Sequence, residues 1–267
     1  MYCVTNKRLK FLEGSSYNLS WVGLEECPEK YIKSSGKINI FKKEKYYSEL
    51  TFHYWYWKNL LDLNSDNWVG FCQKRRFWSK NKHTEKKTYD SSNITQSILV
   101  EPYSEWKDFE VILCEPVKIN KVKKIKMIKR GFRSLIKNPS IFFDTKKQSI
   151  KFHFDMHHGY GNLDRAIDLL ESDDKEDFRN FVNHNTHFNP HIMFISKPKI
   201  IDEWFSKLFQ WLENCESIFG FKDLSGYDTQ RLYAYLAERY LSYWFNKNYK
   251  VLNWPWFFFE EEKLYQN

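Results

Sequence analysis

The sequence YYSELTFHYWYWKNLLDLNSDNWVGFCQKRRFWSK, residues 46–80, contains a helix pattern followed by a strand pattern. Apolar residues in its first half recur at spacings of three and four. They are Leu50, Tyr54, Trp57, Leu60 and Leu61. This periodicity predicts a helix over 47–61 with one buried stripe. Turn-forming residues fill 62–67, and the apolar run 68–72 is too short for a helix, so it predicts a buried strand.

Three cations, Lys74, Arg75 and Arg76, follow this strand directly. A buried strand that ends in cations places positive charge at one edge of a sheet, where ligands of open α/β sheets bind. An arginine pair there matches the geometry and charge of a phosphate or diphosphate. The alternative is that both arginines are simply solvated.

The remaining patterns predict an α/β fold in a single domain, 1–267. Strands are predicted at 2–5, 17–23, 109–114, 150–156 and 192–195, and helices at 118–137, 163–170, 201–215 and 231–244. We divide the domain into a nucleotide-binding half (1–116), a basic amphipathic insertion (117–149) and an acceptor or catalytic half (150–267). The polar segment 83–96 predicts a flexible excursion, with a lid over the site as one role for it.

The composition narrows the class of partner. A net charge of +8 and a pI near 9.0 favour anionic partners: a nucleotide-sugar, a lipid diphosphate, a membrane surface or nucleic acid. The aromatic content of 19% suits both packing and sugar stacking. Five scattered cysteines without CxxC spacing argue against a disulfide framework and a zinc site. Because neither a signal segment nor a membrane span is apparent, we expect a cytoplasmic protein, with the inner face of the membrane as one location for it.

The segment 118–137 carries nine Lys or Arg residues and no acidic residue. Its apolar residues again recur at three and four. They are Val122, Ile125, Ile128, Phe132 and Leu135. Such a helix suits peripheral contact with an anionic membrane surface, or packing on the domain with a solvated basic face. Nucleic acid is the least favoured partner, because no nucleic-acid-binding motif is present.

The predicted strand 150–156 ends in Asp155, His157 and His158. Asp155 and His157 are suitable ligands for a divalent metal, Mn²⁺ or Mg²⁺. No Asp-x-Asp pair follows a predicted strand, however. A diphosphate could therefore be neutralised by that metal, or without metal by Arg75 and Arg76, and we favour the second route.

Several motifs, in order, resemble a family of bacterial capsule and exopolysaccharide glycosyltransferase domains, some of them galactofuranosyl-type transferases. The motifs are Y-x-E-L at 47–50, Y-W-x-W-K-N at 54–59, R-R-F-W at 75–78, H-I-M-F-I-S-K at 191–197 and R-L-Y-A-Y-L-A-E-R-Y-L at 231–241. Gln73 and Lys74 stand where members usually have His-Tyr, and His191 stands where the family has a different side chain.

The resemblance implies a nucleotide-diphospho-sugar transferase (GT-A-like) fold with a mixed sheet and C-terminal helices. It implies transfer of a sugar from a nucleotide-diphosphate donor, with a UDP-sugar favoured, to a glycan or lipid-linked acceptor in surface polysaccharide synthesis. It places Thr5, Asn6 and Lys7 against the nucleotide, beside the diphosphate-binding Arg75 and Arg76. No GxGxxG, P-loop or GxSxG motif favours a dinucleotide oxidoreductase, an NTPase or a hydrolase.

Acceptor activation requires a carboxylate or histidine. Glu238 lies off the apolar stripe of its helix and is our first candidate for the general base, followed by Asp155 and His158. We expect five residues to contact the acceptor or the sugar: His157, His191, Arg231, Glu49 and Asn59.

Two other interpretations remain. The chain could be a non-enzymatic binder, either a basic membrane-surface adaptor or an RNA-binding module. It could also be a degenerate transferase, since Gln73, Lys74 and His191 depart from the family pattern.

Overall fold

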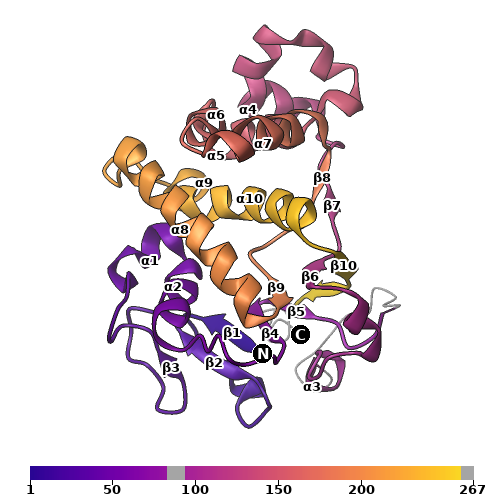
Figure 1. Cartoon of the computed structure of the whole chain (residues 1–267). Helices are drawn as coiled ribbons and strands as arrows, with labels where there is room; N and C mark the ends of the chain where they lie inside the picture. The colour runs from indigo at the N-terminus through magenta and orange to yellow at the C-terminus, as the bar shows by residue number, and fades with distance from the viewer. Residues whose placement is uncertain (83–93, 260–267) are drawn as a thin grey trace, which may run out of the picture.

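The computed structural model of the chain describes residues 1–82 and 94–259 (Figure 1). Its strands are β1 (Tyr2–Thr5), β2 (Asn18–Trp21), β3 (Ile32–Lys33), β4 (Val69–Gln73), β5 (Arg76–Trp78), β6 (Val111–Cys114), β7 (Val117–Lys118), β8 (His187–Phe188), β9 (Phe194–Ser196), β10 (Val251–Trp254) and β11 (Trp256–Phe258). The strands predicted at 2–5, 17–23, 68–72, 109–114 and 192–195 are confirmed, with ends that shift by a residue or two.

The main sheet has the strand order β10-β6-β9-β4-β1-β2-β3. Neighbouring strands from β4 through β1 and β2 to β3 are parallel, and so are β6 and β10. Strand β9 lies between β4 and β6 and runs antiparallel to both. Strand β5 turns back on β4 and pairs with β11. The predicted mixed sheet is therefore confirmed.

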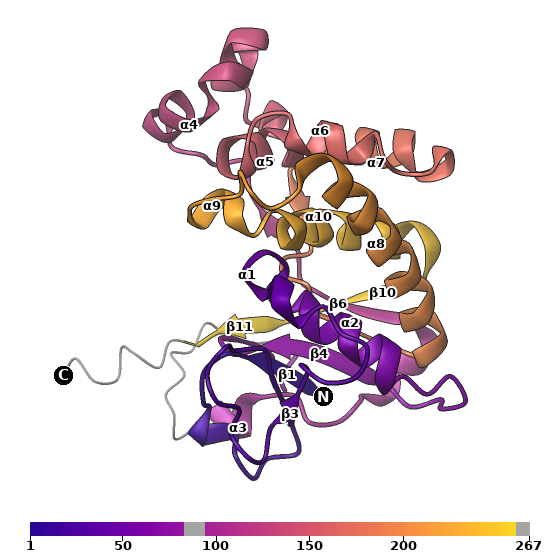
Figure 2. The ribbon, with the colours of Figure 1, turned by 90° about the vertical axis from the view of Figure 1, so that its left-hand side faces the viewer.

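The helices are α1 (Glu44–Tyr47), α2 (Leu50–Asn59), α3 (Ile94–Ser97), α4 (Lys124–Lys137), α5 (Ile150–His158), α6 (Asn162–Ile167), α7 (Ser172–His184), α8 (Pro198–Phe219), α9 (Tyr227–Gln230) and α10 (Leu232–Asn248). Short 3-10 helices lie at Lys10–Leu12, Phe41–Lys43, Ser104–Asp108, Pro139–Phe142 and Thr145–Lys147. Helices α2, α8 and α10 cover one face of the sheet, and α4 to α7 form a further layer beyond α10 (Figures 1 and 2).

Successive strand residues enter two different apolar clusters, because side chains alternate between the faces of a sheet. Phe71 and Leu113 point into the cluster beneath α2, α8 and α10. Their neighbours Cys72 and Ile112 point into the cluster on the opposite face, which contains Trp106. The buried strands therefore read as continuous apolar runs, as is typical of sheets covered on both faces.

The strand predicted at 150–156 is wrong, because these residues form helix α5. The Ser149 hydroxyl caps the helix by accepting a hydrogen bond of 3.3 Å from the backbone N–H of Phe152. Phe152 packs with Met127 in a small cluster beneath α4, whereas Phe154 packs in the main core. A helix buried on two sides can show alternating apolar residues, so the period-two pattern here indicates two buried helical faces rather than a strand.

Helix α2 forms where a helix is predicted, but its buried stripe differs from the prediction. Leu60, beyond the helix, is 41% exposed, and the buried side chains are those of Leu50, Thr51, Phe52, His53, Trp55 and Tyr56. The helix is aromatic on nearly every side and packs between the sheet and α8, so spacing alone did not identify its sheet-facing side.

Two further predictions concern a flexible segment and a membrane-spanning helix. The excursion predicted at 83–96 lies mostly outside them, and its last residues begin α3. Within the described residues, no helix is both long enough and apolar enough to cross a membrane.

Candidate active site at the carboxyl edge of the sheet

The carboxyl ends of β1, β4, β6 and β10 lie at one edge of the sheet, because these strands run in the same direction. Antiparallel β9 starts at that edge, so the segment before it, including His191, lies there as well. Figure 2 shows the side on which β11, α1 and α9 gather beside this edge. In open α/β sheets this edge is the usual place of ligand binding.

The loop after β1 is fixed by its own side chains. The Thr5 hydroxyl accepts a hydrogen bond of 3.0 Å from the Lys7 N–H and donates one of 2.6 Å to the Lys7 carbonyl. The Asn6 side-chain oxygen accepts a hydrogen bond from the ammonium group of Lys74. The structure thus brings the predicted nucleotide loop, Thr5, Asn6 and Lys7, against the cations that follow β4.

Positive charge is concentrated around Lys74. Burial lowers the pKa of Lys74, and the nearby charges of Lys7, Arg231 and Arg75 lower it further. Glu44 of α1 compensates in part, since its negative charge acts in the opposite direction. Arg231, from the N-terminal end of α10, therefore lies in the same cluster as the loops after β1 and β4. This cluster is suited to a ligand with more than one negative charge.

Arg76 lies deeper, beside residues of the sheet and of α2. Its Nη1 donates a hydrogen bond of 3.2 Å to the Gln73 side-chain oxygen, and the Gln73 amide donates in turn to the Glu49 carboxylate. Its guanidinium carbon lies 5.4 Å from the centre of the Phe258 ring. The Nε of Arg76 is buried without a hydrogen-bond partner among the described residues. Arg76 is thus held in place while one donor remains unsatisfied.

Glu238 of α10 meets His191 at the same edge. Its carboxylate accepts a 2.5 Å hydrogen bond from the backbone N–H of His191 and forms an ion pair with the fully buried Arg239. His191 has a φ of +66°, uncommon for a residue with a side chain, and its ring packs edge-on against Trp256 with centres 4.5 Å apart.

The ring of His191 is largely buried, and its Nε2 has no hydrogen-bond partner among the described residues. Burial, with the positive charges of Arg76 and Arg239, lowers its pKa well below the usual value. His191 is therefore neutral at physiological pH. The predicted residues Arg76, His191 and Glu238 are thus brought together by the fold.

A cavity of about 650 Å³ adjoins the cluster of cations. Its lining includes Asn6, Lys7 and Lys74, together with Trp21 at the end of β2. The cavity therefore connects the loops after three neighbouring parallel strands, and its aromatic and polar walls could hold a nucleoside.

Residues 1–249 match the family DUF4422, a domain of unknown function. The chain belongs to the DUF4422 family. A solved structure of the bifunctional glycosyltransferase WbbM, in its apo form, is similar with a TM-score of 0.65 at 16% sequence identity. The similarity covers 97% of this chain and 45% of that chain, so the chain spans less than half the length of this neighbour. No curated protein matches the chain.

These two similarities bear out the resemblance to a glycosyltransferase-like domain family. They also bear out the α/β, GT-A-like fold, in which a mixed sheet is flanked by helices. Some of the predicted site residues of this DUF4422 domain lie away from the carboxyl edge of the sheet.

Asp155 is not at a strand end, since the strand predicted there is helix α5. Helix α10 lies between α5 and the sheet (Figures 1 and 2). Asp155 forms a 2.6 Å ion pair with Lys151 and accepts a 3.0 Å hydrogen bond from the Gly161 N–H. It lines a separate cavity of about 480 Å³, together with Lys137 and Tyr160. The fold therefore does not bring Asp155 to the carboxyl edge.

His157 and His158 are also on α5, near its C-terminal end. His157 contacts Arg130 of α4 through Nδ1, at 3.1 Å. His158 stacks on Tyr235 of α10, with ring centres 3.7 Å apart, and its Nδ1 lies 2.8 Å from the Asp228 carbonyl oxygen. Burial lowers the pKa of His157 to about 4 and that of His158 to about 3, so both are neutral. These contacts join α4, α5, α9 and α10.

Glu49 and Asn59 are at opposite ends of α2. Glu49 precedes the helix and lies at the candidate site through Gln73. Asn59 ends the helix, about 15 Å further along its axis. The Asn59 amide donates to the carbonyls of Ile38 and Trp55 and its oxygen accepts from the Ile38 N–H. Asn59 therefore anchors the segment before α1, and the fold does not place it at the carboxyl edge.

A divalent metal would need several His, Cys, Asp or Glu ligands placed close together. Among the described residues, no group of three or more His, Cys, Asp and Glu side chains is placed to hold one. Asp155 and His157, the predicted ligand pair, are two positions apart on a helix and so do not face each other. The cavity beside this edge is lined by the cations Lys7, Arg8 and Lys74 and by the carboxylates of Glu25, Glu26 and Glu29.

Lys74, Gln73, Glu44 and Trp256 are among the residues at the site that were not predicted as site residues. Lys74 is part of the same K-R-R run as the predicted arginines, so its charge was a usable signal. Gln73 lies where the resembled family usually has another residue, and its position between Glu49 and Arg76 could not be read from spacing. Trp256 reaches the site only because β11 pairs with β5, more than 170 residues earlier in the chain.

Proposed function

We propose that the chain is a glycosyltransferase that moves a sugar from a nucleotide-diphosphate donor to the hydroxyl group of an acceptor. The observation that carries this proposal is the cluster of five cations, Lys7, Lys74, Arg75, Arg76 and Arg231, at the ligand-binding edge of a GT-A-like fold. A diphosphate in this cluster would meet preorganised positive charge in a partly buried place, where electrostatic stabilisation is strongest.

The donor would lie across the loops after β1 and β4. Its nucleoside, uridine being favoured, would occupy the cavity lined by Asn6 and Trp21, and its diphosphate would lie against Lys74, Arg75 and Arg76. The unsatisfied Nε of Arg76 supports this placement, because a bound phosphate oxygen would supply the acceptor that this group lacks. The fork of an arginine can also bind two phosphate oxygens at once.

The chemistry follows from these positions. The acceptor oxygen forms a bond to the anomeric carbon, the bond from that carbon to the diphosphate oxygen breaks, and the diphosphate leaves with the electron pair. The acceptor proton passes to a base, for which we propose Glu238. Both oxygens of its carboxylate are engaged, but each retains a second lone pair. Neutral His191 would border the acceptor without adding charge.

The acceptor is a glycan or a lipid-linked saccharide, and the reaction belongs to surface polysaccharide synthesis. Two aromatic side chains of β11 support a sugar acceptor. Trp256 is partly exposed beside His191, and Phe258, 44% exposed, lies against Arg75 and Arg76. Aromatic rings at a polar site suit the apolar faces of sugars.

A ligand panel tests the proposal. Thermal unfolding of the full chain is followed with nucleotide-sugars and free nucleoside diphosphates, each with Mn²⁺, Mg²⁺ or EDTA, and release of nucleoside diphosphate is then measured for each donor that binds. We expect one donor to raise the melting temperature equally with metal and with EDTA, and that donor to be turned over.

Other outcomes point elsewhere. Binding without turnover on any glycan or lipid-linked acceptor would indicate a degenerate transferase. No donor binding, together with strongly salt-dependent binding of RNA, would replace the proposal with a non-enzymatic binder.

A further inference from the structure

Helix α4 is held against the protein by a narrow face of small and flexible residues. Met127, Gly131 and Ser134 are buried. A Cβ atom on Gly131 would lie 2.9 Å from the Phe152 ring of α5, so the two helices approach closely at this point. Met127 and Phe152 share a small apolar cluster. The helix is therefore docked firmly, and its exposed side chains do not result from loose packing.

The next face of α4 is apolar and exposed. Ile125, Ile128, Phe132 and Ile136 are 70%, 53%, 60% and 64% exposed. Their spacings of three, four and four place them in one row along the helix. Phe143, 81% exposed, follows shortly after the helix. Other exposed large apolar residues of the described chain are scattered over many elements, which a soluble surface tolerates, whereas this continuous row indicates an interaction surface.

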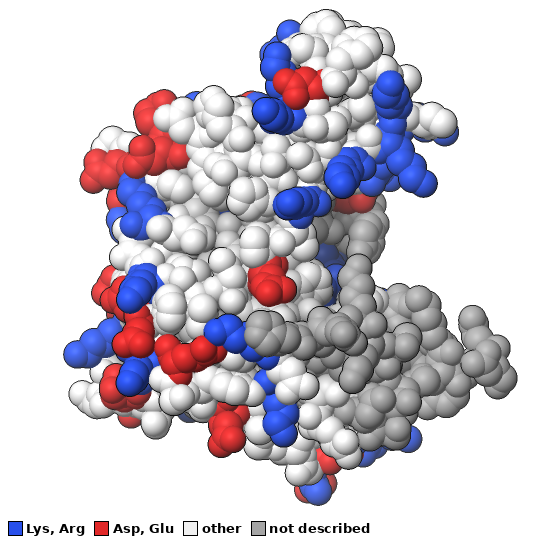
Figure 3. Space-filling model, turned by 90° about the vertical axis from the view of Figure 1, so that its right-hand side faces the viewer, with Lys and Arg blue, Asp and Glu red and all other residues white. Residues whose placement is uncertain are grey.

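The third face of α4 is basic. At about 100° per residue, Lys126, Lys129, Arg133 and Lys137 follow the apolar row around the helix. No acidic residue occurs between Lys118 and Lys137. Figure 3 shows Lys and Arg side chains gathered over the upper helices on this side of the molecule. Apolar and basic faces thus lie side by side along the same exposed surface.

We propose that α4 docks the protein on an anionic lipid surface and that the acceptor is consequently lipid-linked. The second half rests on the proposed function. An apolar row next to a basic row matches the acyl boundary and the phosphate layer of a membrane interface. Nucleic acid would satisfy the cations but leave the apolar row in water, and a second copy of α4 would bring like charges together.

The position of α4 supports the link to the acceptor. Arg130, on the inner border of its basic face, forms an ion pair of 2.8 Å with Asp228 of α9. Figure 2 shows α4 in the layer beyond α10, on the same side of the molecule as α9 and β11. A saccharide attached to a membrane lipid would therefore rise from the docking surface on the side of the candidate active site.

Vesicle sedimentation of the full chain tests the docking. We expect sedimentation with phosphatidylcholine vesicles that contain phosphatidylglycerol, and little with phosphatidylcholine alone. The double variant Ile128→Ser, Phe132→Ser should bind at least about tenfold more weakly, because it removes the two central members of the four-residue apolar row. Lys129→Glu with Arg133→Glu should weaken binding comparably and reduce its salt dependence.

Matched controls separate docking from general surface properties. Leu63→Ser with Ile218→Ser removes exposed apolar residues elsewhere, and Lys107→Glu with Lys222→Glu changes the same charge elsewhere. Both should bind vesicles like the wild type. Equal binding by wild type and both α4 variants, or no binding by the wild type, overturns the docking. So does a wild-type dimer in light scattering that the α4 variants convert to monomers, or wild-type RNA binding that exceeds vesicle binding.

The acceptor is tested with the same variants. Transfer to a lipid-linked acceptor in vesicles should fall at least about tenfold in both α4 variants, whereas transfer to a water-soluble acceptor should not change. Equal loss on both acceptors, or on neither, overturns the lipid-linked acceptor. Absence of transfer in every protein, wild type included, overturns the proposed function and with it the lipid-linked acceptor, while the sedimentation result still decides the docking.

Discussion

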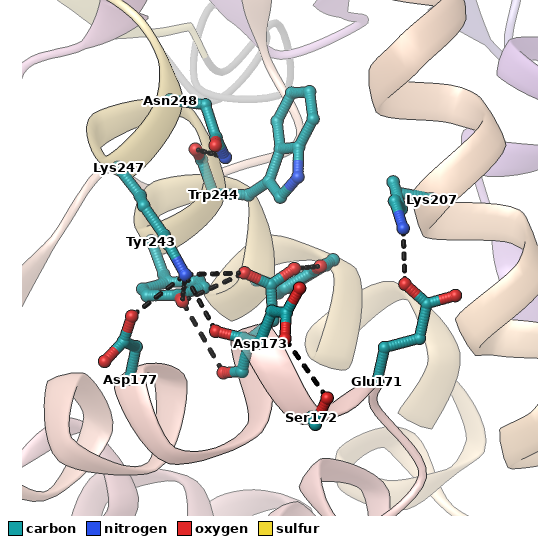
Figure 4. A network of polar contacts seen from close by, with 11 residues as sticks. Glu171, Ser172, Asp173, Asp177, Lys207, Tyr243, Trp244, Lys247 and Asn248 are labelled. Atoms are coloured by element: carbon teal, nitrogen blue, oxygen red, sulfur yellow. Dashed lines mark hydrogen bonds and ion pairs between the residues drawn. The ribbon is translucent and has the colours of Figure 1, made fainter.

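Helix α10 carries two groups of charged residues that differ in how far their charges are satisfied. One joins α10 to α7 around Asp174, and Figure 4 shows its neighbours Tyr243, Lys247 and Asp177. Asp174 accepts hydrogen bonds from Tyr240 at 2.8 Å and from Tyr243 at 3.1 Å, and Lys247 lies 3.1 Å from the same carboxylate. Lys247 also pairs with Asp177 at 2.9 Å. Asp174, Asp177, Tyr240, Tyr243 and Lys247 thus all have partners within the protein.

The second group, at the carboxyl edge, differs in its buried nitrogens. Lys74 lies there among the charges of Lys7, Arg75, Arg231 and Glu44, and Glu238 pairs with Arg239. Buried nitrogens of Arg76 and His191 lack hydrogen-bond partners among the described residues. A network that holds helices together satisfies its members, whereas a site that binds an anion keeps donors for it. Substitutions should therefore affect stability in the first region and function in the second.

The largest effect is expected from Glu238→Gln. Glutamine can still accept the hydrogen bond from His191, but it cannot take the acceptor proton, so kcat should fall by about 10²–10⁴-fold. The dissociation constant of the donor should stay within about threefold, because Glu238 bonds to the His191 N–H and to Arg239 rather than to a diphosphate cation. Single-turnover kinetics and calorimetry measure the two quantities. An unchanged kcat would assign Glu238 to the support of Arg239 and His191 alone.

Arg76→Ala should reduce transfer by about 10²–10³-fold, as expected for loss of one preorganised group that stabilises the departing diphosphate. Its melting temperature should remain almost unchanged, since Arg76 donates one hydrogen bond of 3.2 Å and leaves Nε unsatisfied. Arg179→Ala is the matched control, because Arg179 pairs with Asp168 and Asp164 near the surface. Full activity of Arg76→Ala, or an unfolded protein, would contradict the assignment.

The Asp174 network should respond in the opposite way. Asp174→Ala leaves the buried hydroxyl of Tyr240 without its acceptor and separates Lys247 from one carboxylate, so the free energy of unfolding should fall by about 2–3 kcal/mol. Below the melting transition, kcat should match that of the wild type within about twofold. Urea unfolding and a transfer assay on the same sample measure both. A loss of kcat without a loss of stability would erase the distinction between the two regions.

The sequence predicted the parts of the site that depend on local pattern. A short apolar run followed by K-R-R placed cations at a sheet edge, and Glu238 lay off the apolar stripe of its helix. These inferences need only the period of a strand or helix and the direction in which it ends. The resemblance added the loop of Thr5, Asn6 and Lys7, which the structure brings against Lys74.

The sequence did not show which side of each helix or strand contacts residues that are distant in the chain. Phe152 and Phe154 of α5 face two different clusters, so the apolar residues of this helix alternate as they would in a strand. Asp155 was therefore wrongly expected at a strand end. Asn59 is polar and off the predicted stripe, but its partner Ile38 belongs to a loop with no recognisable pattern. Trp256 contacts His191 because its strand, β11, pairs with β5, more than 170 residues earlier in the chain.

The smallest expected effect separates the two regions by pH. Burial would raise the pKa of Asp174, but hydrogen bonds from Tyr240, Lys247 and Tyr243 outweigh it and hold this pKa below the usual range. A depressed carboxyl pKa contributes stability that is complete above the unfolded value, about 3.9, and is lost as pH falls through the folded value. The stability difference between wild type and Asp174→Asn should therefore be constant near neutral pH and shrink only below about pH 4.

His191 should act in a different range. Burial and the charges of Arg76 and Arg239 lower its pKa well below the unfolded value of about 6.5. As pH falls below about 6.5, His191 therefore binds a proton in the unfolded chain but not in the folded chain. His191 thus makes the protein less stable as pH falls. His191→Gln should flatten the dependence of unfolding free energy on pH just below about pH 6.5, by up to 1.4 kcal/mol per pH unit, and Asp174→Asn should leave that range unchanged. Urea unfolding at closely spaced pH values resolves the two ranges. An unaltered slope in His191→Gln would mean that His191 binds its proton as readily in the folded protein as in the unfolded one, and that the carboxyl edge does not hold this ring in its neutral form.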